Sequence, residues 1–421
     1  MDVIRDTAAL AALCDRLASA EFVTVDTEFL RETTFWPKLC LVQLATVEES
    51  AIVDPLAEDL SLDPLFALLN EASPTKVFHA ARQDIEIFHN LSGKVPTPIF
   101  DTQVAAMVLG FGDSIAYDAI VNKITGAVID KSSRFTDWSA RPLSDAQLTY
   151  AMADVTHLCH VYTHLRDALA AKEREAWVAQ EMALLSSPDT YDLKPEDAWK
   201  RLKSRAKQPV ELACLQELAA LREREARARN VPRNRVLKDD AIYEIALQRP
   251  ANAEALSRLR AVSKGFERSK LGQAVLATVN EVLARPADTL PPIVRRKPNI
   301  EGASAAVDLM KVLLKLCAEA NGVAPKVIAT VDDLEAIVAG NDAPALSGWR
   351  RAVFGEAALR LKAGEIAIAF DGRRLNTIDC ERPINPEPAG RSSTARRRRR
   401  RKGGEGGSTT VDAAPAEAPS E

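Results

Sequence analysis

Residues 22–29 read Phe22-Val23-Thr24-Val25-Asp26-Thr27-Glu28-Phe29, an apolar run that ends in two carboxylates. Branched and aromatic residues at this density predict a buried strand. Successive side chains of a strand point to opposite faces, so Asp26 and Glu28, two residues apart, point to the same side of a sheet. Adjacent anions repel each other unless a cation lies between them. An isolated Asp-x-Glu also occurs by chance, at strand edges and turns, and needs support from the rest of the chain.

Strand-like and helix-like segments alternate around this stretch. Further strands are predicted at residues 39–47, 51–54 and 76–79. Helices are predicted at residues 63–70, 82–90, 102–109 and 115–123, and one long helix over 144–185. Alternation of this kind predicts an α/β domain over residues 1–185, in which helices flank a mixed sheet.

Further polar residues of this domain occupy positions suited to chemistry. Asp84 lies in the first turn of the helix after the strand that ends at His79, although a carboxylate there also stabilises the helix dipole. Tyr150 and Asp154 are four residues apart in a helical segment and therefore share one helix face. Taken alone, such a pair is more often simply half-buried. Asp101 precedes another helix and is better explained as its cap than as a metal ligand.

The combination is more specific than any of its parts. An Asp-x-Glu follows one strand, an Asp follows a second strand, and a Tyr-x-x-x-Asp lies on a later helix. Hydrolysis by two metal ions needs about this many carboxylates, because two divalent cations roughly 3.5–4 Å apart carry four positive charges. One ion activates a water and the other stabilises the leaving oxygen. Hard oxygen ligands suit Mg²⁺ or Mn²⁺.

The net charge of −4 over the 421 residues is distributed unevenly. Residues 1–185 hold 14 Lys and Arg against 27 Asp and Glu, a net −13, whereas residues 200–297 hold 22 against 11, a net +11. An acidic domain suits metal cations and a basic one suits phosphate groups. Both could be ordinary solvated surfaces, but the size of the difference favours a polyanionic partner for the basic segment.

Beyond residue 185 the pattern is helical. A Pro-containing linker is predicted at 186–197. The same order of a helix, a Pro with a basic residue, and an Asp-Asp pair occurs twice, which predicts two copies of one all-α domain at 200–290 and 303–380, unless two unrelated helix pairs match by chance. From 381 to 421, Pro, Gly, Ser, Thr and Ala dominate, with one unbroken basic run at Arg396–Lys402, and predict a disordered tail. Its arginine run either assists nucleic-acid binding or only solubilises the chain.

These motifs resemble the ribonuclease D family, within the DEDD exonuclease superfamily, over about residues 1–380. The segments that carry the resemblance are Val25–Phe29, Trp36–Leu44, Val77–Asp84, Phe100–Gln103, Trp138–Leu143 and Tyr150–Asp154. A sister group has a His five residues before the last Asp, where this chain has Thr149, so the resemblance is to the tyrosine subclass.

The resemblance implies an RNase H-like exonuclease domain that removes nucleotides from the 3′ end of RNA and releases nucleoside 5′-monophosphates. It implies tRNA precursors with 3′ extensions as substrates, and HRDC domains, which bind nucleic acid, for the two helical units. The second unit departs more from the HRDC pattern. The implied ligands of two divalent metal ions are Asp26, Glu28, Asp84 and Asp154, with Tyr150 positioning the attacking water.

Several residues are candidate RNA contacts. Gln43 either faces the substrate or fills the sheet, and His79 either touches the site or is a hydrogen-bonded histidine at a strand end. Arg141 and its neighbour Trp138 either contact RNA or are a surface arginine and a packed tryptophan. In the basic segment the candidates are Arg227, Arg229, Arg233 and Arg235.

Two alternatives to an exoribonuclease remain at this point: a DNA 3′→5′ exonuclease and a non-catalytic RNA-binding protein. The complete set of carboxylates and the tyrosine argue against a non-catalytic protein. Comparing substrates with and without the 2′-hydroxyl would separate an exoribonuclease from a DNA exonuclease, because this group is how a site distinguishes RNA from DNA. No apolar run is long enough to cross a membrane, and six scattered cysteines suit a reducing compartment, so we expect a cytoplasmic protein. No protein partner is evident.

Overall fold

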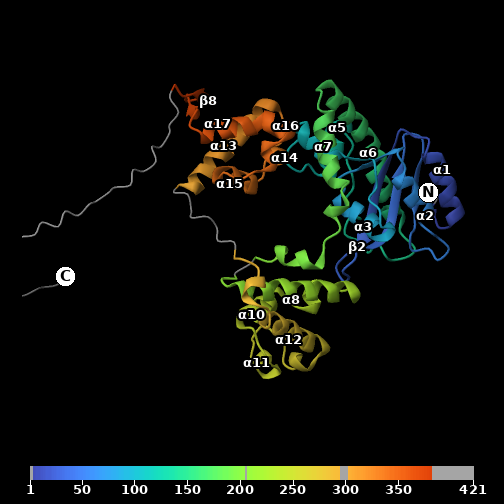
Figure 1. The fold of residues 1–421 in the computed structure, drawn as a ribbon. Helices are drawn as coiled ribbons and strands as arrows, with labels where there is room; N and C mark the ends of the chain where they lie inside the picture. Colours follow the sequence, from blue (N-terminus) through green and yellow to red (C-terminus); the bar gives the residue numbers. More distant parts are fainter. Residues whose placement is uncertain (1–2, 204–205, 294–301, 382–421) are drawn as a thin grey trace, which may run out of the picture.

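The computed structural model describes residues 3–203, 206–293 and 302–381. Figure 1 shows a sheet with its helices in the first part of the chain, a helical group around α8–α12, and a second helical group that contains α13–α17. The predicted tail lies outside the described residues, apart from Glu381.

The sheet has six strands in the order β1-β4-β3-β2-β5-β6. The central strand β2 is antiparallel to β3 and parallel to β5, while β4 is antiparallel to β3, and β1 and β6 pair in parallel at the two edges. This mixed sheet confirms the predicted α/β class. The sequence pattern did not indicate β1 and β6, because strands of two and three residues are too short for alternation to stand out. The strands are β1 (Val3–Ile4), β2 (Phe22–Leu30), β3 (Lys38–Ala45), β4 (Ser50–Val53), β5 (Thr75–Phe78) and β6 (Ile99–Asp101).

Helices cover both faces of the sheet. α6 crosses the face that carries the even-numbered side chains of β2, where the Thr24 hydroxyl donates to the Val155 carbonyl oxygen at 3.0 Å. α1 lies on the opposite side (Figure 1), where its leucines share a core with Val23 and Val25. The helices of this domain are α1 (Thr7–Leu17), α2 (Asp63–Asn70), α3 (Arg82–Ser92), α4 (Thr102–Val108), α5 (Tyr117–Thr125), α6 (Asp145–Ala171) and α7 (Glu175–Leu185).

The predicted single helix over 144–185 is wrong, because the chain turns between α6 and α7. Glu173 adopts a left-handed conformation, with φ of 56°, which ends a helix. Nothing in the local sequence marks this turn, since Lys172, Glu173 and Arg174 are all good helix formers. Tertiary contacts fix it instead, because the Arg174 guanidinium donates to the Val108 carbonyl oxygen at 2.9 Å.

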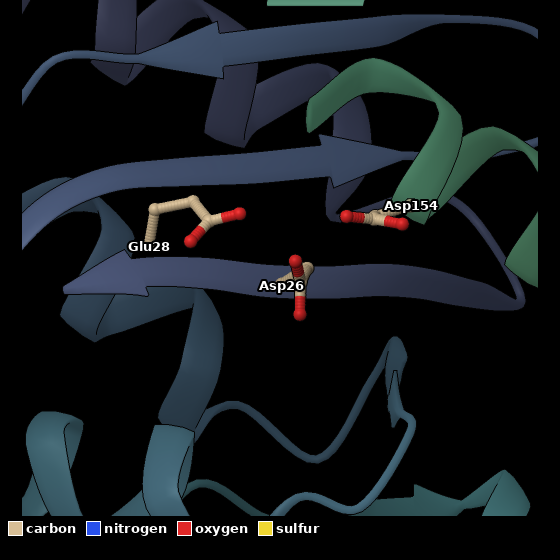
Figure 2. Close-up of side chains that lie close together, drawn as sticks. All are labelled: Asp26, Glu28 and Asp154. Carbon is tan, nitrogen blue, oxygen red and sulfur yellow. The ribbon is translucent and has the colours of Figure 1, made fainter. Parts of the chain in front are cut away.

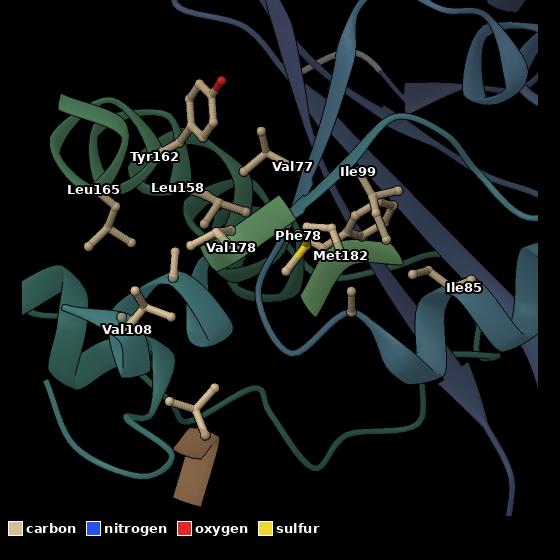
Figure 3. Close-up of a cluster of buried hydrophobic side chains, with 14 of the residues drawn as sticks. Val77, Phe78, Ile85, Ile99, Val108, Leu158, Tyr162, Leu165, Val178 and Met182 are labelled. Carbon is tan, nitrogen blue, oxygen red and sulfur yellow. The ribbon is translucent and has the colours of Figure 1, made fainter. Parts of the chain in front are cut away.

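The turn allows α7 to pack back onto the domain. Figure 3 shows Val178 and Met182 of α7 among buried side chains of the sheet, α3, α4 and α6. Met182 also accepts the backbone N–H of Asp101 on its sulfur at 3.2 Å. α7 is therefore part of the core of the first domain.

The first helical group has a core of its own. α8 packs against α10 and α12, and the 3₁₀ helix η2 (Pro195–Arg201) from the linker packs along α8. Phe35, at the tip of the β2–β3 hairpin, is buried in this core and joins the group to the sheet domain. The helices are α8 (Pro209–Ala228), α9 (Arg233–Val236), α10 (Asp239–Gln248), α11 (Ala253–Ser257) and α12 (Lys270–Leu283).

The second helical group shares the core of the sheet domain, which the sequence did not indicate. Trp349 stacks on Trp177 of α7, with ring centroids 4.6 Å apart. The groups approach closely at Gly110, where a Cβ would lie 2.6 Å from the Gly322 carbonyl oxygen. An unpredicted two-stranded hairpin follows the helices. The elements are α13 (Ala303–Asn321), α14 (Pro325–Ile328), α15 (Val331–Ala339), α16 (Gly348–Arg350), a π-helical turn (Arg351–Gly355), α17 (Glu356–Lys362), β7 (Ile366–Phe370) and β8 (Leu375–Asp379).

Candidate active site

The central strand places two carboxylates on the face that α6 covers. Asp26 pairs in register with Gln43 of β3, and Glu28 pairs with Leu41. The register shifts between Glu28 and Phe29, and a bulge at this position re-aims the side chains around it. Both carboxylates are half-buried.

α6 brings a third carboxylate to the same place. The helix begins at a capping box formed by Ser144, and Tyr150 and Asp154 follow on successive turns. One oxygen of each of Asp26, Glu28 and Asp154 lies within 4.8 Å of the other two. Figure 2 shows the three side chains converging from β2 and α6. The Tyr150 hydroxyl forms a hydrogen bond with the Asp154 carboxyl group.

Asp84 lies at the edge of this cluster, in the first turn of α3. It is 8% exposed and accepts a hydrogen bond from the Thr27 hydroxyl. The Asp101 carboxylate fixes the turn before α3, because it accepts the backbone N–H groups of Ala80 and Ala81 at 3.0 and 2.9 Å. Asp101 also caps α4, which confirms the predicted capping role. Through this turn it sets where α3, and with it Asp84, begins.

Burial raises the pKa of all four carboxyl groups, and repulsion between carboxylates adds to the effect at Asp26, Glu28 and Asp84. Burial raises the pKa of Asp26 and of Asp84 well above the usual range, and the charges of Asp154 and Asp26, respectively, add to the effect. Burial, followed by repulsion from the neighbouring carboxylates, raises the pKa of Glu28 to about 9. Burial raises the pKa of Asp154 to about 7, although the hydrogen bond from Tyr150 opposes it. A cation bound among them would reverse these shifts.

The donor set fits a divalent metal ion. Every converging atom is a carboxylate oxygen, which is the ligand type that Mg²⁺ and Mn²⁺ prefer. Such an ion would relieve the repulsion between the carboxylates, which contributes to their raised pKa values. The arrangement suits hydrolysis of a phosphodiester at a cluster of metal-binding carboxylates.

Comparison with known proteins places this site in a family. Residues 1–170 match the sequence family described as 3′-5′ exonuclease, and residues 211–279 match the HRDC domain. Ribonuclease D of Nitrobacter hamburgensis is 54% identical over 381 residues, which cover 90% of this chain and 100% of that protein. Ribonuclease D of Acidiphilium cryptum is 51% identical, with 90% and 97% covered. The chain belongs to the ribonuclease D family.

Solved structures agree with this assignment. The crystal structure of Escherichia coli RNase D, described as an exoribonuclease involved in structured RNA processing, superposes with a TM-score of 0.77 at 31% identity. The match covers 86% of this chain and 98% of that chain. The protein is therefore a 3′→5′ exoribonuclease of the ribonuclease D family, which depends on divalent metal ions, and it carries an HRDC domain, a module that binds nucleic acid.

Two candidate RNA contacts of the first domain are buried or half-buried. Gln43 is fully buried opposite Asp26, and neither polar atom of its amide has a partner among the described residues. The ring nitrogens of His79 lie 2.9 Å from the Thr102 hydroxyl and 3.2 Å from the Ile115 carbonyl oxygen, and burial lowers the pKa of the ring. His79 thus connects the end of β5 to the start of α4 and to the loop before α5, and its contacts give no support to a role in RNA binding.

Arg141, another candidate RNA contact, forms several hydrogen bonds within the fold. Its guanidinium forms two hydrogen bonds with the Asp54 carboxylate, at 2.6 and 2.7 Å, and donates to the Cys40 carbonyl oxygen at 2.7 Å. The Trp138 ring is 3% exposed and packs against Cys40 and Ala151. Both residues hold the loop before α6 against the sheet, so we do not include them in the RNA-binding surface.

The four arginines of the HRDC domain divide into two pairs. Arg227 and Arg233 both bind the buried Glu223 carboxylate, at 3.1 and 2.5 Å. Their guanidinium groups also lie over the Phe35 ring, 5.6 and 4.5 Å from its centroid, so they attach the HRDC domain to the β2–β3 hairpin. Arg229 and Arg235 are exposed, and within the described part of the chain neither forms an ion pair.

Tyr117 supports the site, and sequence reasoning missed it. Its hydroxyl donates to the Ala153 carbonyl oxygen at 3.1 Å and holds α6 next to the residue that precedes Asp154. Burial, and then the charges of Asp154 and Asp26, raise its pKa above the usual range. No motif marks a tyrosine whose partner is a backbone atom of a distant helix.

A loop beside the cluster carries exposed groups that the sequence analysis also missed. The charge of Arg134 is close enough to lower the pKa of Glu28 and Asp154. The guanidinium lies 5.2 Å from the ring centroid of Phe135, which is 90% exposed.

No helix in the described ranges is both long and apolar enough to cross a membrane. All six cysteines are free thiols.

Proposed function

We propose that this exoribonuclease trims the 3′ extensions of tRNA precursors in the cytoplasm and releases nucleoside 5′-monophosphates. The observation that carries the proposal is the convergence of Asp26, Glu28 and Asp154 within 4.8 Å, with Asp84 beside them. The involvement of Escherichia coli RNase D in structured RNA processing supports tRNA precursors as the substrate class.

The four carboxylates would hold two divalent ions, Mg²⁺ or Mn²⁺. Asp26 is central to both, because its charge acts on Glu28 and on Asp84, which lie on different elements. Bound ions would supply the positive charge that activates a water and stabilises the leaving oxygen. Thr27 orients the Asp84 carboxylate through its hydroxyl, as hydrogen-bonded neighbours of metal ligands commonly do.

Tyr150 would position the attacking water. Burial and the neighbouring carboxylates raise its pKa, so the phenol remains protonated and does not act as a base at neutral pH. Its hydroxyl hydrogen-bonds to Asp154 and keeps an oxygen lone pair for a water. Tyr150 therefore orients the attacking water and does not remove its proton.

RNA would be held by the basic segment of residues 200–297. Arg229 and Arg235 are its exposed candidates, since Arg227 and Arg233 are occupied by Glu223. The second helical group, residues 303–380, repeats the helix order of the HRDC domain but packs against α7. We assign it to stabilisation of the exonuclease domain.

The test is digestion of a tRNA precursor with a 3′ extension, in Mg²⁺, beside the same extension made of DNA. We expect stepwise shortening of the RNA to the mature 3′ end, no shortening in EDTA, and slow shortening of DNA. Equal rates on both extensions would favour the DNA exonuclease. Binding of the precursor without any shortening would favour the non-catalytic RNA-binding protein.

A further inference from the structure

A cleft of about 360 Å³ lies where the β2–β3 hairpin meets the linker and the HRDC domain. Four of its lining residues are arginines: Arg31 after β2, Arg201 at the end of η2, Arg222 on α8 and Arg233 on α9. Asp239 is the one carboxylate among the described residues that line it. The cleft therefore belongs to both domains and is strongly basic.

Carboxylates around the cleft do not balance its positive charge. Glu86 pairs with Arg31 at 2.9 Å, and Asp239 pairs with Arg222. Glu223 is shared between Arg227 and Arg233. Five guanidinium groups thus face three carboxylates, and within the described ranges no carboxylate forms an ion pair with Arg201.

Arg222 gives a second, independent indication of a ligand. Its side chain is 5% exposed, and its Nε–H has no acceptor among the described residues. Nη1 of the same group donates to the Leu237 carbonyl oxygen at 3.1 Å and to Asp239. A buried N–H of a charged group without an acceptor is costly, and an oxyanion bound to the same guanidinium would offset part of that cost.

The cleft is built on the same elements as the candidate active site. Arg31 follows Glu28 by three residues, which is a distance of about 10 Å along an extended chain. Its partner Glu86 lies two residues after Asp84 on α3. An RNA strand whose 3′ end lies at the carboxylates would therefore pass the cleft a short distance upstream.

We infer that this arginine cleft binds a backbone phosphate of the RNA upstream of the scissile nucleotide. Planar guanidinium groups match the paired oxygens of a phosphate. Arg201 forms no ion pair among the described residues, and Arg222 holds one N–H without an acceptor there. The inference rests on the proposed function, because it takes RNA as the ligand. Inorganic phosphate and a nucleoside monophosphate share the same chemistry, so the test separates them from RNA.

The experiment compares the full-length protein with Arg201→Gln, a change at an exposed side chain that should not affect folding. For a longer single-stranded RNA in Mg²⁺ we expect KM to rise about tenfold at unchanged kcat, the loss typical of a charge-assisted hydrogen bond. A dinucleotide is too short to reach the cleft, and its turnover should not change. The salt slope of RNA binding in EDTA should become shallower by about 0.7, the value for one phosphate on a single strand.

Two variants serve as controls. Arg201→Lys keeps the charge and should recover part of the affinity. Arg258→Gln removes an arginine that pairs with Glu254 on the exposed surface outside the cleft, and it should leave KM unchanged.

Three results would overturn the inference. The KM for the longer RNA could stay unchanged in Arg201→Gln, or the dinucleotide could lose as much turnover as the longer RNA. Inorganic phosphate could also bind in calorimetry in an Arg201-dependent manner while RNA affinity is unaffected, which would make free phosphate the ligand. A wild-type protein that fails to shorten RNA in Mg²⁺ would reject the proposed function, while RNA binding in EDTA would still test the cleft.

Discussion

The Thr27 hydroxyl donates a hydrogen bond to the Asp84 carboxylate, which joins β2 to the first turn of α3. Thr27 lies between Asp26 and Glu28 on β2. Three consecutive residues of this strand therefore supply two carboxylates and hold the Asp84 carboxylate. The strand that carries two carboxylates therefore also orients a third one, which comes from a helix.

Thr27→Val keeps the shape of this side chain and removes its hydroxyl. Asp84 would then lose its orienting partner, and we expect the Mg²⁺ concentration for half-maximal activity to rise about 10-fold to 100-fold, the usual effect of losing such a partner. Saturating Mg²⁺ should restore most of the activity. The matched control is Thr163→Val on α6, whose hydroxyl donates to the Cys159 carbonyl oxygen at 3.0 Å. An unchanged Mg²⁺ requirement in Thr27→Val would indicate that Asp84 does not bind the metal ion.

Tyr150→Phe removes the hydroxyl that contacts Asp154 and leaves the ring in place. If the hydroxyl only orients a water, kcat should fall by about 10²-fold with little change in RNA affinity. Tyr117→Phe is the comparison, because its hydroxyl supports α6 through the Ala153 carbonyl oxygen and should affect stability as well as rate. Weaker RNA binding at normal kcat would make Tyr150 a substrate contact.

The metal-free protein should lose stability as the pH rises. Glu28 and Asp154 have pKa values of about 9 and 7 in the folded state, against ordinary values of 4.5 and 3.8. Between these limits the folded protein binds more protons than the unfolded chain, so the free energy of unfolding decreases from about pH 4 to about pH 9.

Thermal unfolding in EDTA across this pH range measures the effect. Mg²⁺ should raise the melting temperature more at pH 8.5 than at pH 6, because bound protons compete with the ion. Asp154→Asn should flatten the pH dependence below about pH 7. A melting temperature in EDTA that stays constant from pH 5 to 9 would mean that the pKa values of Glu28 and Asp154 are not raised by their surroundings.

The second helical group should stabilise the exonuclease domain. Arg350 reaches the buried Glu181 carboxylate of α7 at 2.6 Å, and their side chains are 17% and 9% exposed. Arg350→Ala leaves Glu181 buried without its partner and should lower the free energy of unfolding by about 3 kcal/mol.

The neighbouring residue provides a control in the same helical segment. Arg351 pairs with Glu356 at the surface, where both side chains are more than half exposed, and Arg351→Ala should cost less than about 1 kcal/mol. Chemical denaturation of the two variants measures the difference. Equal, small losses would show that the group is only loosely attached.

The positions of Asp26, Glu28, Tyr150 and Asp154 could be predicted because each pair depends on local geometry. Alternation along a strand and the four-residue repeat of a helix fix which side chains share a face. The position of Asp101 directly before a helix also predicted its capping role. The meeting of these two pairs depends on how α6 crosses β2. It could be expected only from the family resemblance.

Roles that depend on distant partners could not be predicted. Arg141 and Arg233 look like surface arginines in the sequence, but Asp54 and Glu223 bind them in the fold. The turn at Glu173 has helix formers on both sides and is set by the tertiary contact between Arg174 and α4. The shared core of α7 and the second helical group likewise has no local signal, because a tryptophan such as Trp349 packs equally well within its own domain.

The measurement closest to the central claim is digestion of a 5′-labelled single-stranded RNA by the wild-type protein and by Asp26→Asn. The substitution keeps the size of the side chain and removes one ligand charge at the centre of the cluster. In Mg²⁺ the wild type should give a ladder that shortens by single nucleotides from the 3′ end, with nucleoside 5′-monophosphates as product. Asp26→Asn should melt at least as high as the wild type in EDTA and yield no ladder. A folded Asp26→Asn that shortens the RNA at a near-normal rate, or a wild type that yields internal fragments, would contradict the account.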